Sequence, residues 1–472
     1  MEWRFGDKDL HPLKAITPID GRYRKRVEEA ERYFSEYALI HARLRVEVKF
    51  LERFVKNVEK SLEESLPEDW CEKLREIVRE FDLGEAEKVK GIEERVGHDV
   101  KALINYLRVR LREKGLKSLS SLIHIGLTSN DVNNIAYSTL LRDFLREVYL
   151  PELVKLLKKL VEIAQTHLDT AMLGRTHGQP ATPTTFGKFT ANYAYRIAEI
   201  LEKIAGFKFP GKIGGAVGDN SALKIVYPNI DWESFSREFV EELGLEFYPA
   251  STQILPHDRL STLLSTIAIL NSVLSNLCRD LWMLGALGLL RFVRRVGEAH
   301  SSTMPHKSNP IYLENAEGAL DLASSILSYM AGRLLSSRLH RDLSDSVIKR
   351  FYGVGFTLSL LGLRSLLEGL MRIWVDVEAM RREVEAHRET LAEAVQLILR
   401  RYGVEEGYEI VQKSIEEGWE KLLETLEGVD VPEEALRMIQ ELRPESYAAE
   451  ASKSAKALVE DVIRILERLK TG

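Results

Sequence analysis

The sequence predicts an all-α fold, and three observations support this prediction. Apolar side chains recur at spacings of three and four residues over most of the 472-residue chain, as they do in amphipathic helices. Alternating strand patterns are scarce. No stretch has the strand–helix–strand order from which parallel sheets are built. We therefore expect packed helices joined by turns and loops.

The periodic segments predict long helices in a definite order along the chain. In residues 28–58 the apolar spacing runs through Phe34, Ala38 and Leu44, and in residues 140–168 it runs through Leu153 and Leu160. Further helices are predicted over residues 186–204, 260–292, 312–335, 347–374 and 377–400.

One of these helices resembles a membrane span. Residues 260–278 carry no charge over 19 positions, about the length that crosses a bilayer. Serine, threonine and asparagine residues are spread through the segment, Arg279 and Asp280 follow it directly, and its flanks lack a clear aromatic belt. We interpret it as a central core helix and expect no association with membranes.

Three domains are predicted: an N-terminal helical domain over residues 1–112, a central helical bundle over residues 113–364 and a C-terminal helical domain over residues 365–472. The central helices carry more apolar surface than one bundle of this size needs. A thick monomeric core is one explanation. Burial between subunits is the other, and we favour it.

Composition excludes several classes of protein. The net charge is −6, from 66 basic and 72 acidic residues, and no basic stripe with interleaved aromatic residues marks a nucleic-acid binder. Cys71 and Cys278 cannot form a disulfide framework, and the first residues lack the apolar core of a signal peptide. We expect a cytoplasmic protein.

Polar residues gather in breaks between the helices. The breaks are residues 17–23, 96–99, 126–131, 175–183, 211–220, 301–310 and 341–346. The glycine cluster at 211–220 lacks the spacing of a nucleotide-binding loop, the 11 histidines show no zinc-binding pattern, and no serine-hydrolase elbow occurs. A reaction without metal or cofactor is the simplest inference.

The segment 301–310 has a specific pattern. It matches the S-S-x-M-P-x-K-x-N signature and so resembles the fumarase/aspartase superfamily, and His306 is the form typical of its adenylosuccinate lyase branch. Segments similar to that branch also occur around residues 17–23, 97–102, 127–131, 175–183, 253–257 and 341–346. The resemblance implies an all-α fold of three domains, a homotetramer, and active sites that are each built from three subunits.

The resemblance also implies a reaction. Members of this branch eliminate fumarate from adenylosuccinate to give AMP, and from the succinylated aminoimidazole-carboxamide ribotide of purine biosynthesis. Such an elimination needs a base that removes a proton beside a carboxylate and an acid that protonates the departing nitrogen. A serine is a poor base unless a closed loop and positive groups stabilise its alkoxide.

The family's functional residues map onto this sequence one by one. Ser302 is the expected base, His177 the expected acid and His98 a supporting residue. Lys307, Asn309, Thr128 and Ser129 are expected to bind succinyl carboxylates. Arg22, Tyr23 and Arg341 are suited to a phosphate, because arginine binds phosphate in a bidentate manner. The remaining expected substrate-binding residues are Gly97, Asp99, Gln253, Asn315, Ser346 and Arg350.

One residue departs from the family pattern. His300 stands where a glycine usually precedes the two serines, and a histidine tolerates fewer backbone conformations than glycine. The loop is therefore expected to be stiffer or to close differently.

Two alternative functions remain to be separated. Argininosuccinate lyase or fumarase is disfavoured by His306 and by the arginines placed for a phosphate. A non-enzymatic scaffold, like some eye-lens crystallins, is disfavoured because the chain keeps Ser302 and His177.

Overall fold

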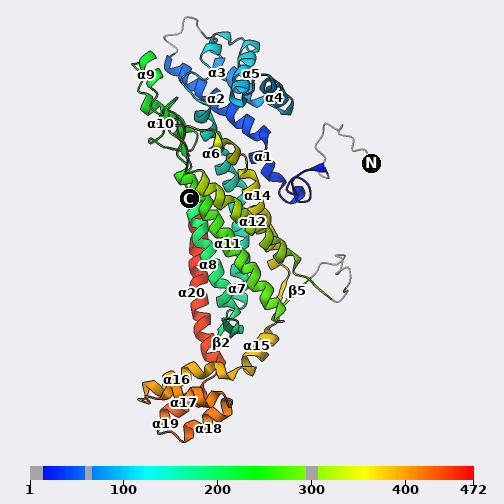
Figure 1. Ribbon diagram of the computed structural model, residues 1–472, viewed down its shortest axis with the longest axis vertical. Coiled ribbons are helices and arrows are strands. Elements are labelled where there is room, and N and C mark those ends of the chain that lie inside the picture. Colours follow the sequence, from blue (N-terminus) through cyan, green and yellow to red (C-terminus); the bar gives the residue numbers. More distant parts are fainter. Residues whose placement is uncertain (1–13, 59–65, 294–303, 305–306, 472) are drawn as a thin grey trace. The chain divides into compact units, whose positions relative to one another are not determined.

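The computed structural model describes residues 14–58, 66–293, 304 and 307–471 (Figure 1). Helices dominate this part of the chain, which confirms the predicted fold class. The strands among the described residues form three two-stranded pairs.

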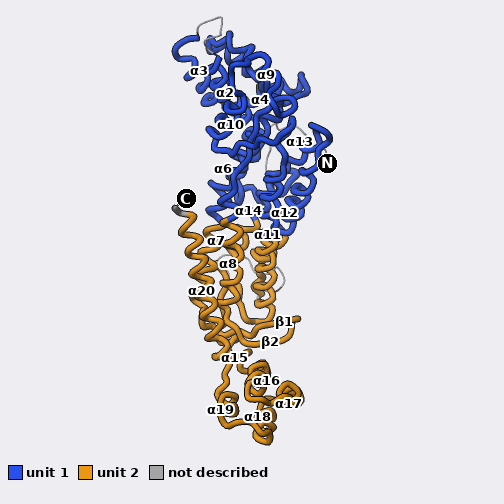
Figure 2. Tube along the Cα trace, turned by 90° about the vertical axis from the view of Figure 1, so that its left-hand side faces the viewer, with its two compact units in different colours: residues 1–152, 203–271, 319–361 blue, residues 153–202, 272–318, 362–472 orange. Residues whose placement is uncertain are grey.

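The contacts within the chain define two compact units (Figure 2). Unit 1 contains residues 1–152, 203–271 and 319–361, and unit 2 contains residues 153–202, 272–318 and 362–472. The predicted division into three domains at residues 112 and 364 stays a prediction.

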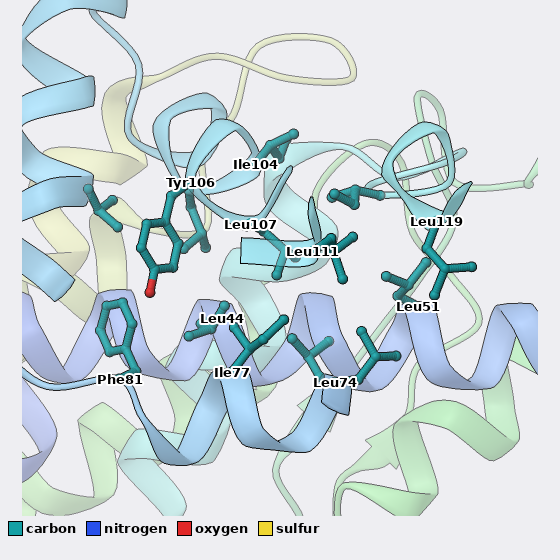
Figure 3. Close-up of a cluster of buried hydrophobic side chains, with 14 of the residues drawn as sticks. Leu44, Leu51, Leu74, Ile77, Phe81, Ile104, Tyr106, Leu107, Leu111 and Leu119 are labelled. Atoms are coloured by element: carbon teal, nitrogen blue, oxygen red, sulfur yellow. The ribbon is translucent and has the colours of Figure 1, made fainter. Parts of the chain in front are cut away.

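Unit 1 is built on helix α2 and the helices that pack against it. Its elements are α1 (Glu31–Phe34), α2 (Glu36–Val58), α3 (Trp70–Arg79), α4 (Leu83–Val96), α5 (Asp99–Glu113), α6 (Ser129–Phe144), α9 (Ser221–Val226), α10 (Trp232–Glu242), α13 (Ser344–Lys349) and the parallel strands β3 (Pro210–Gly211) and β4 (Glu246–Phe247). Leu44 of α2, Leu74 and Ile77 of α3, and Leu107 of α5 are fully buried against one another (Figure 3). The spacing of three residues between Leu74 and Ile77 on α3, and of four between Leu107 and Leu111 on α5, places each pair on one face of its helix.

Unit 2 contains long helices, a hairpin and a group of short helices. Its elements are α7 (Leu150–Thr166), β1 (Ala171–Thr176), β2 (Gln179–Thr185), α8 (Phe186–Ala205), β5 (Leu290–Phe292), β6 (Ile373–Val375), α15 (Val377–Ala386), α16 (Ala392–Arg401), α17 (Gly407–Ile415), α18 (Trp419–Glu427), α19 (Glu433–Glu441) and α20 (Pro444–Thr471). The hairpin packs on α15 and α20. Helices α16 to α19 enclose a core of their own around Val395, Leu399 and Leu422.

Five of the described helices have residues in both units. Two of them, α7 and α8, lie mostly in unit 2, and the others are α11 (Asp258–Ala286), α12 (Ile311–Arg333) and α14 (Tyr352–Leu370). The predicted helices at 186–204 and 312–335 agree with α8 and α12 to within two residues at each end.

Several predicted helices are wrong in their extent. The helix predicted at 28–58 is interrupted at Ser35, whose backbone is extended. The hydroxyl of Ser35 then caps the start of α2 by accepting a hydrogen bond from the N–H of Ala38 at 3.1 Å. The helix predicted at 140–168 contains a π-helical turn, Leu145–Tyr149, just before Pro151. Since proline has no N–H and its ring collides with the carbonyl four residues earlier, a wider turn relieves that collision.

Three other long predicted helices also end early or divide. Helix α11 ends at Ala286, and Gly288, with φ +78°, turns the chain into β5. The segment predicted as one helix over 347–374 becomes the end of α13, then α14, then β6, and the segment over 377–400 divides at His387 into α15 and α16.

The apolar segment at 260–278 lies within a buried helix. By length and composition, α11 and the stretch Ser344–Leu370 are the two described helical segments that could cross a membrane. In their most apolar windows 67% and 72% of the residues are buried inside the protein. This burial supports the interpretation as core helices.

Candidate active site

The N-terminus of α5 carries the first predicted group. Gly97 has φ +67° and ends α4, and His98 directly follows as the N-cap of α5, with its Nδ1 accepting a hydrogen bond from the N–H of Lys101 at 3.2 Å. Because Nδ1 accepts, Nε2 is the ring nitrogen that can donate to a ligand.

Asp99 joins this helix to α2 and α13. Its carboxylate accepts hydrogen bonds from Arg43 at 2.8 Å and from Arg350 at 3.0 Å. Burial alone would raise the pKa of Asp99, but the charges of Arg43 and Arg350 and the N–H of Val100 hold that pKa below its usual value. Asp99 is therefore an anion that fixes the guanidinium of Arg350.

Arg350 also holds Ser346. Its guanidinium donates to Ser346 Oγ at 2.7 Å, one helical turn earlier. The structure thus brings together three of the predicted substrate-binding residues: Asp99, Ser346 and Arg350.

Arg341 belongs to a second charged group in unit 1. Asp345 accepts from Arg341 at 3.2 Å and from the buried Lys349 at 2.5 Å. Burial, then the charge of Lys349, lowers the pKa of the nearby His257 to about 3, although Asp345 opposes this shift. His257 is therefore neutral at neutral pH, and Arg341 and Lys349 together outweigh the one carboxylate, which suits an anionic ligand.

The turn at residues 17–23 faces a cavity of about 270 Å³. Thr17, Asp20 and Arg24 line this cavity together with Arg350 and Gly353. The predicted turn is confirmed, since the N–H of Gly21 donates to the carbonyl of Thr17 at 3.1 Å.

Two of the predicted phosphate ligands lie on this turn. The guanidinium of Arg22 lies 5.9 Å from the centre of the Tyr23 ring. The described contacts thus join Arg22 to Tyr23 rather than to Arg341.

The N-terminus of α6 carries Thr128 and Ser129. Thr128 is the N-cap: its side chain accepts from the N–H of Asp131 and its own N–H donates to the Asp131 carboxylate at 2.8 Å, which together make a capping box. Ser129 is the first residue of the helix and is half-buried. Free N–H groups at such a helix start are suited to a carboxylate.

Gln253 lies in the loop before α11. Its side-chain amide donates to the backbone carbonyl of Ala216 at 3.3 Å, and its backbone carbonyl accepts from the Lys212 ammonium at 2.5 Å. The loop at 211–220, whose glycines lack the spacing of a nucleotide-binding loop, therefore contacts a predicted substrate-binding residue.

In unit 2, His177 lies at the tip of the β1–β2 hairpin. Thr176 pairs with Gln179, so His177 and Gly178 form a two-residue turn, with φ +54° and +75°. Positive φ at both positions is the requirement of a type I′ turn. The side chain of His177 is exposed at this tip.

The predicted residues after the signature serines are partly described. Lys307 is exposed, and Asn309 is half-buried, with an Oδ1 that is buried and has no hydrogen-bond partner among the described residues. Asn315, on α12, donates to Ser365 Oγ at 2.9 Å. Ser302, His300 and His306 lie outside the described residues.

Sequence reasoning missed four buried residues beside the predicted ones: Asp131, Lys212, His257 and Lys349. Asp131 had a signal, because it follows Thr128 by three residues, the spacing of a capping box. Lys349 had a partial signal, because Asp345 stands four residues earlier at the spacing of a helical ion pair. Lys212 had none, since its partner Asp131 is distant in the sequence and a lysine is almost never fully buried unless it is paired. Among the described residues, no group of three or more histidine, cysteine, aspartate or glutamate side chains is suited to a metal.

Known proteins are similar to this chain over most of its length. A family model described as lyase matches residues 21–322, and a model described as adenylosuccinate lyase C-terminal matches residues 337–448. The chain is 37% identical to the adenylosuccinate lyase of Legionella pneumophila (strain Corby) over 95% of this chain and 99% of that protein. It is also 37% identical to the adenylosuccinate lyase of Escherichia coli (strain K12) over 94% of this chain and 98% of that protein.

Solved structures show the same fold at lower identity. A fumarate lyase from Mesorhizobium sp. BNC1 aligns with a TM-score of 0.73 and 23% identity over 92% of this chain and 97% of its own. A 3-carboxy-cis,cis-muconate lactonizing enzyme from Pseudomonas putida aligns with a TM-score of 0.73 and 21% identity over 93% and 98%.

Proposed function

Since the chain belongs to the adenylosuccinate lyase family and is a carbon–nitrogen lyase, we propose that it removes fumarate from adenylosuccinate, leaving AMP, and from the succinylated aminoimidazole-carboxamide ribotide. The observation that carries the proposal is the identity of 37% over 95% of the chain, together with the match to the C-terminal model. This match disfavours argininosuccinate lyase and fumarase.

The proposed reaction is an elimination with two proton transfers. Ser302 removes the proton from the carbon beside a succinyl carboxylate, the electron pair forms the double bond of fumarate, and the carbon–nitrogen bond breaks. His177 gives a proton to the departing nitrogen. Each positioned acid or base contributes about 10²–10⁴-fold to the rate.

The remaining roles follow the resemblance to the family, and most of them match a charged group of the substrate. Lys307, Asn309, Thr128 and Ser129 bind the succinyl carboxylates, where extra negative charge develops in the transition state. His98 supports His177. The phosphate is bound by Arg22, Tyr23, Arg341, Ser346 and Arg350, and the pocket is completed by Gly97, Asp99, Gln253 and Asn315. The excess positive charge around Arg341 and the fixed guanidinium of Arg350 support a phosphate site.

We also propose a homotetramer whose active sites are shared between subunits. Large apolar side chains lie exposed on two of the long helices of the single chain: Ile269, Trp282 and Met283 on α11, and Leu322 and Tyr329 on α12. Apolar surface of this kind marks an interface between proteins. For the location we propose the cytoplasm, which fits a sequence with two cysteines, too few for a disulfide framework.

The base is tested by an absorbance assay with adenylosuccinate. We expect wild-type protein to release AMP and fumarate, and Ser302→Ala to lose turnover while still binding adenylosuccinate in equilibrium dialysis. Ser118→Ala, at an exposed serine on a 3₁₀ turn, is the control for handling and should keep its rate. A wild-type rate in Ser302→Ala would remove the assignment of the base, and an inactive wild-type protein would remove the proposed reaction.

A further inference from the structure

A buried ion pair lies beneath the loops that carry Thr128, Ser129 and Gln253. Asp131 and Lys212 have side chains that are 0% and 1% exposed, and the Lys212 ammonium lies 2.7 Å from Asp131 Oδ1. Neither side chain reaches solvent, so neither can exchange protons with a substrate. Each nevertheless contacts a segment that carries a proposed ligand.

The Asp131 carboxylate accepts hydrogen bonds from donors in two loops. Its Oδ1 accepts from Lys212 and from the N–H of Gly214 at 3.0 Å. Its Oδ2 accepts from the N–H of Thr128 at 2.8 Å and from the N–H of Gly215 at 3.1 Å. One carboxylate thus ties the start of α6 to the loop at 211–220.

Lys212 links the Asp131 carboxylate to a third loop, which carries Gln253. Its ammonium donates to the carbonyl of Gln253 as well as to Asp131. Its backbone is held from α6, because Asn134 accepts from its N–H at 2.9 Å and donates to its carbonyl at 3.0 Å. The position of Lys212 is therefore fixed from both ends.

Glycines let these three loops approach one another closely. A Cβ at Gly215 would lie 2.8 Å from the carbonyl oxygen of Gly126, and a Cβ at Gly218 would lie 2.3 Å from the carbonyl oxygen of Ser251. Both glycines also have positive φ, at +67° and +98°. With so little free space, a shift at Lys212 is transmitted to its neighbours rather than absorbed.

The charge of Lys212 has a cost that Asp131 offsets. Burial lowers the pKa of Lys212, and the adjacent carboxylate opposes this shift. Removing one partner leaves a buried charge without its counter-charge, which is far less favourable than losing a surface pair.

We propose that Lys212 and Asp131 are positioning residues that set the spacing between Thr128–Ser129 and Gln253 for the succinyl part of the substrate. The inference rests on the proposed function for the identity of the ligand. It goes beyond that function because it assigns a role in substrate selection to two residues that do not touch the substrate.

The kinetic test uses the two products as separate probes. In Lys212→Met, which keeps the chain length and removes the charge, we expect the inhibition constant of fumarate to rise about tenfold or more, the effect of losing one buried charged hydrogen bond. The inhibition constant of AMP should change less than that of fumarate, because the described hydrogen bonds of the Lys212 ammonium go to Asp131 and Gln253, whereas the charge of the proposed phosphate ligand Arg341 acts on Lys212 only through space. Equal changes for both products, or no change for either, would overturn the proposal.

A matched control separates positioning from stability. Glu52 is another buried carboxylate of unit 1, paired with Lys56 at 2.7 Å and with Arg75 at 2.7 Å, and it is not among the proposed site residues. Glu52→Gln should lower the melting temperature while both inhibition constants stay unchanged. A selective loss of fumarate inhibition in Glu52→Gln would show that any buried charge has the same effect.

Hydrogen exchange tests the same idea without activity. In Lys212→Met, amides in residues 126–131 and 251–255 should both exchange faster than in wild type, whereas Glu52→Gln should leave them unchanged. If Lys212→Met does not fold, Asp131→Asn is used, and it should loosen residues 126–131 and 212–215. Unchanged amide exchange in these variants contradicts the positioning role, even if the wild-type protein cleaves adenylosuccinate. A wild-type protein that does not cleave adenylosuccinate contradicts only the proposed reaction.

Discussion

His177 has a backbone conformation that residues with a side chain seldom adopt. Its φ of +54° is part of the hairpin turn, so the residue proposed as the acid is also a turn residue. Asparagine, aspartate and histidine enter this region several times more often than other residues with a side chain, and His124 does so as well, with φ +60°. The conformation of His177 therefore reflects the turn, and its chemical role has to be tested separately.

Two substitutions separate the turn from the chemistry. Asparagine tolerates positive φ, so His177→Asn should be as stable as wild type, and His177→Ala should be less stable than His177→Asn by about 1 kcal/mol. Both variants should lack turnover, because neither side chain can serve as the acid near neutral pH. Urea unfolding and the absorbance assay measure the two effects, and a wild-type rate in His177→Asn would exclude His177 as the acid.

His257 makes the stability depend on pH. Its pKa is about 3 in the folded protein against an ordinary 6.5, because it is buried beside Lys349 and Arg341, with Asp345 opposing. The unfolded chain therefore binds a proton below pH 6.5 that the folded chain does not. Stability should fall as the pH drops from 6.5 toward 3, by about 1.4 kcal/mol per pH unit from this residue.

The substitution His257→Gln removes this titration. The free energy of unfolding of this variant, measured with urea at pH 7, 6 and 5, should fall less steeply with decreasing pH than that of wild type. The two slopes should differ by at most the contribution of one bound proton. Parallel curves for the two proteins would mean that His257 is protonated in the folded state.

Single residues were predictable where a local pattern places them. Thr128 at a helix start and Gly97 at a helix end agree with capping rules. The buried Lys212 was not predictable, because its partner Asp131 is brought to it by another element of the fold. Lys349 pairs with Asp345 one turn earlier in α13, so its pairing was visible in the sequence and its burial was not. The resemblance to a family, rather than periodicity, supplied the candidate ligands.

At the scale of elements, the helices were predictable and their interruptions were not. The β1–β2 hairpin was missed because Pro180 and Pro183 argue against a central strand, yet a two-stranded pair has only edges, where proline is tolerated. The helix boundaries at Ser35 and His387 depend on capping and packing that a periodic pattern does not register.

Two glycines test the close packing of the loops at the scale of elements. Gly403 and Gly218 have φ of +87° and +98°, but a Cβ at Gly403 would meet nothing within 4 Å, whereas one at Gly218 would overlap the carbonyl of Ser251. Gly403→Ala should cost about 1–2 kcal/mol from backbone strain alone. Gly218→Ala should cost about 3 kcal/mol or more, because overpacking is added to the strain.

Urea unfolding of the two alanine variants measures this difference. Equal losses in the free energy of unfolding would show that the loop at 211–220 can move away from residues 251–252, and that the two loops are not rigidly packed.

At the scale of the whole molecule, a shared active site makes a prediction about mixtures. If each site takes Ser302 and His177 from different subunits, then inactive Ser302→Ala and His177→Ala chains complement each other. An equal mixture that is unfolded and refolded together should regain about a quarter of wild-type activity, since each residue is intact in half of the chains. The two variants refolded separately and then combined are the control, and a refolded mixture that stays inactive excludes shared sites.

The division of the sequence between the units has a consequence for synthesis. Unit 1 takes its last stretch, residues 319–361, from a part of the chain that leaves the ribosome long after residues 1–152. At about 5–20 residues per second, the delay between residues 152 and 361 is about 10–40 s. During this time the ring of Phe34 lacks its stacking partner Phe356, and the hydroxyl of Tyr149 lacks Ser359. A nascent chain therefore holds open apolar surface for many seconds, and a message cut short before residue 361 yields a product for chaperones and proteases rather than a smaller working enzyme.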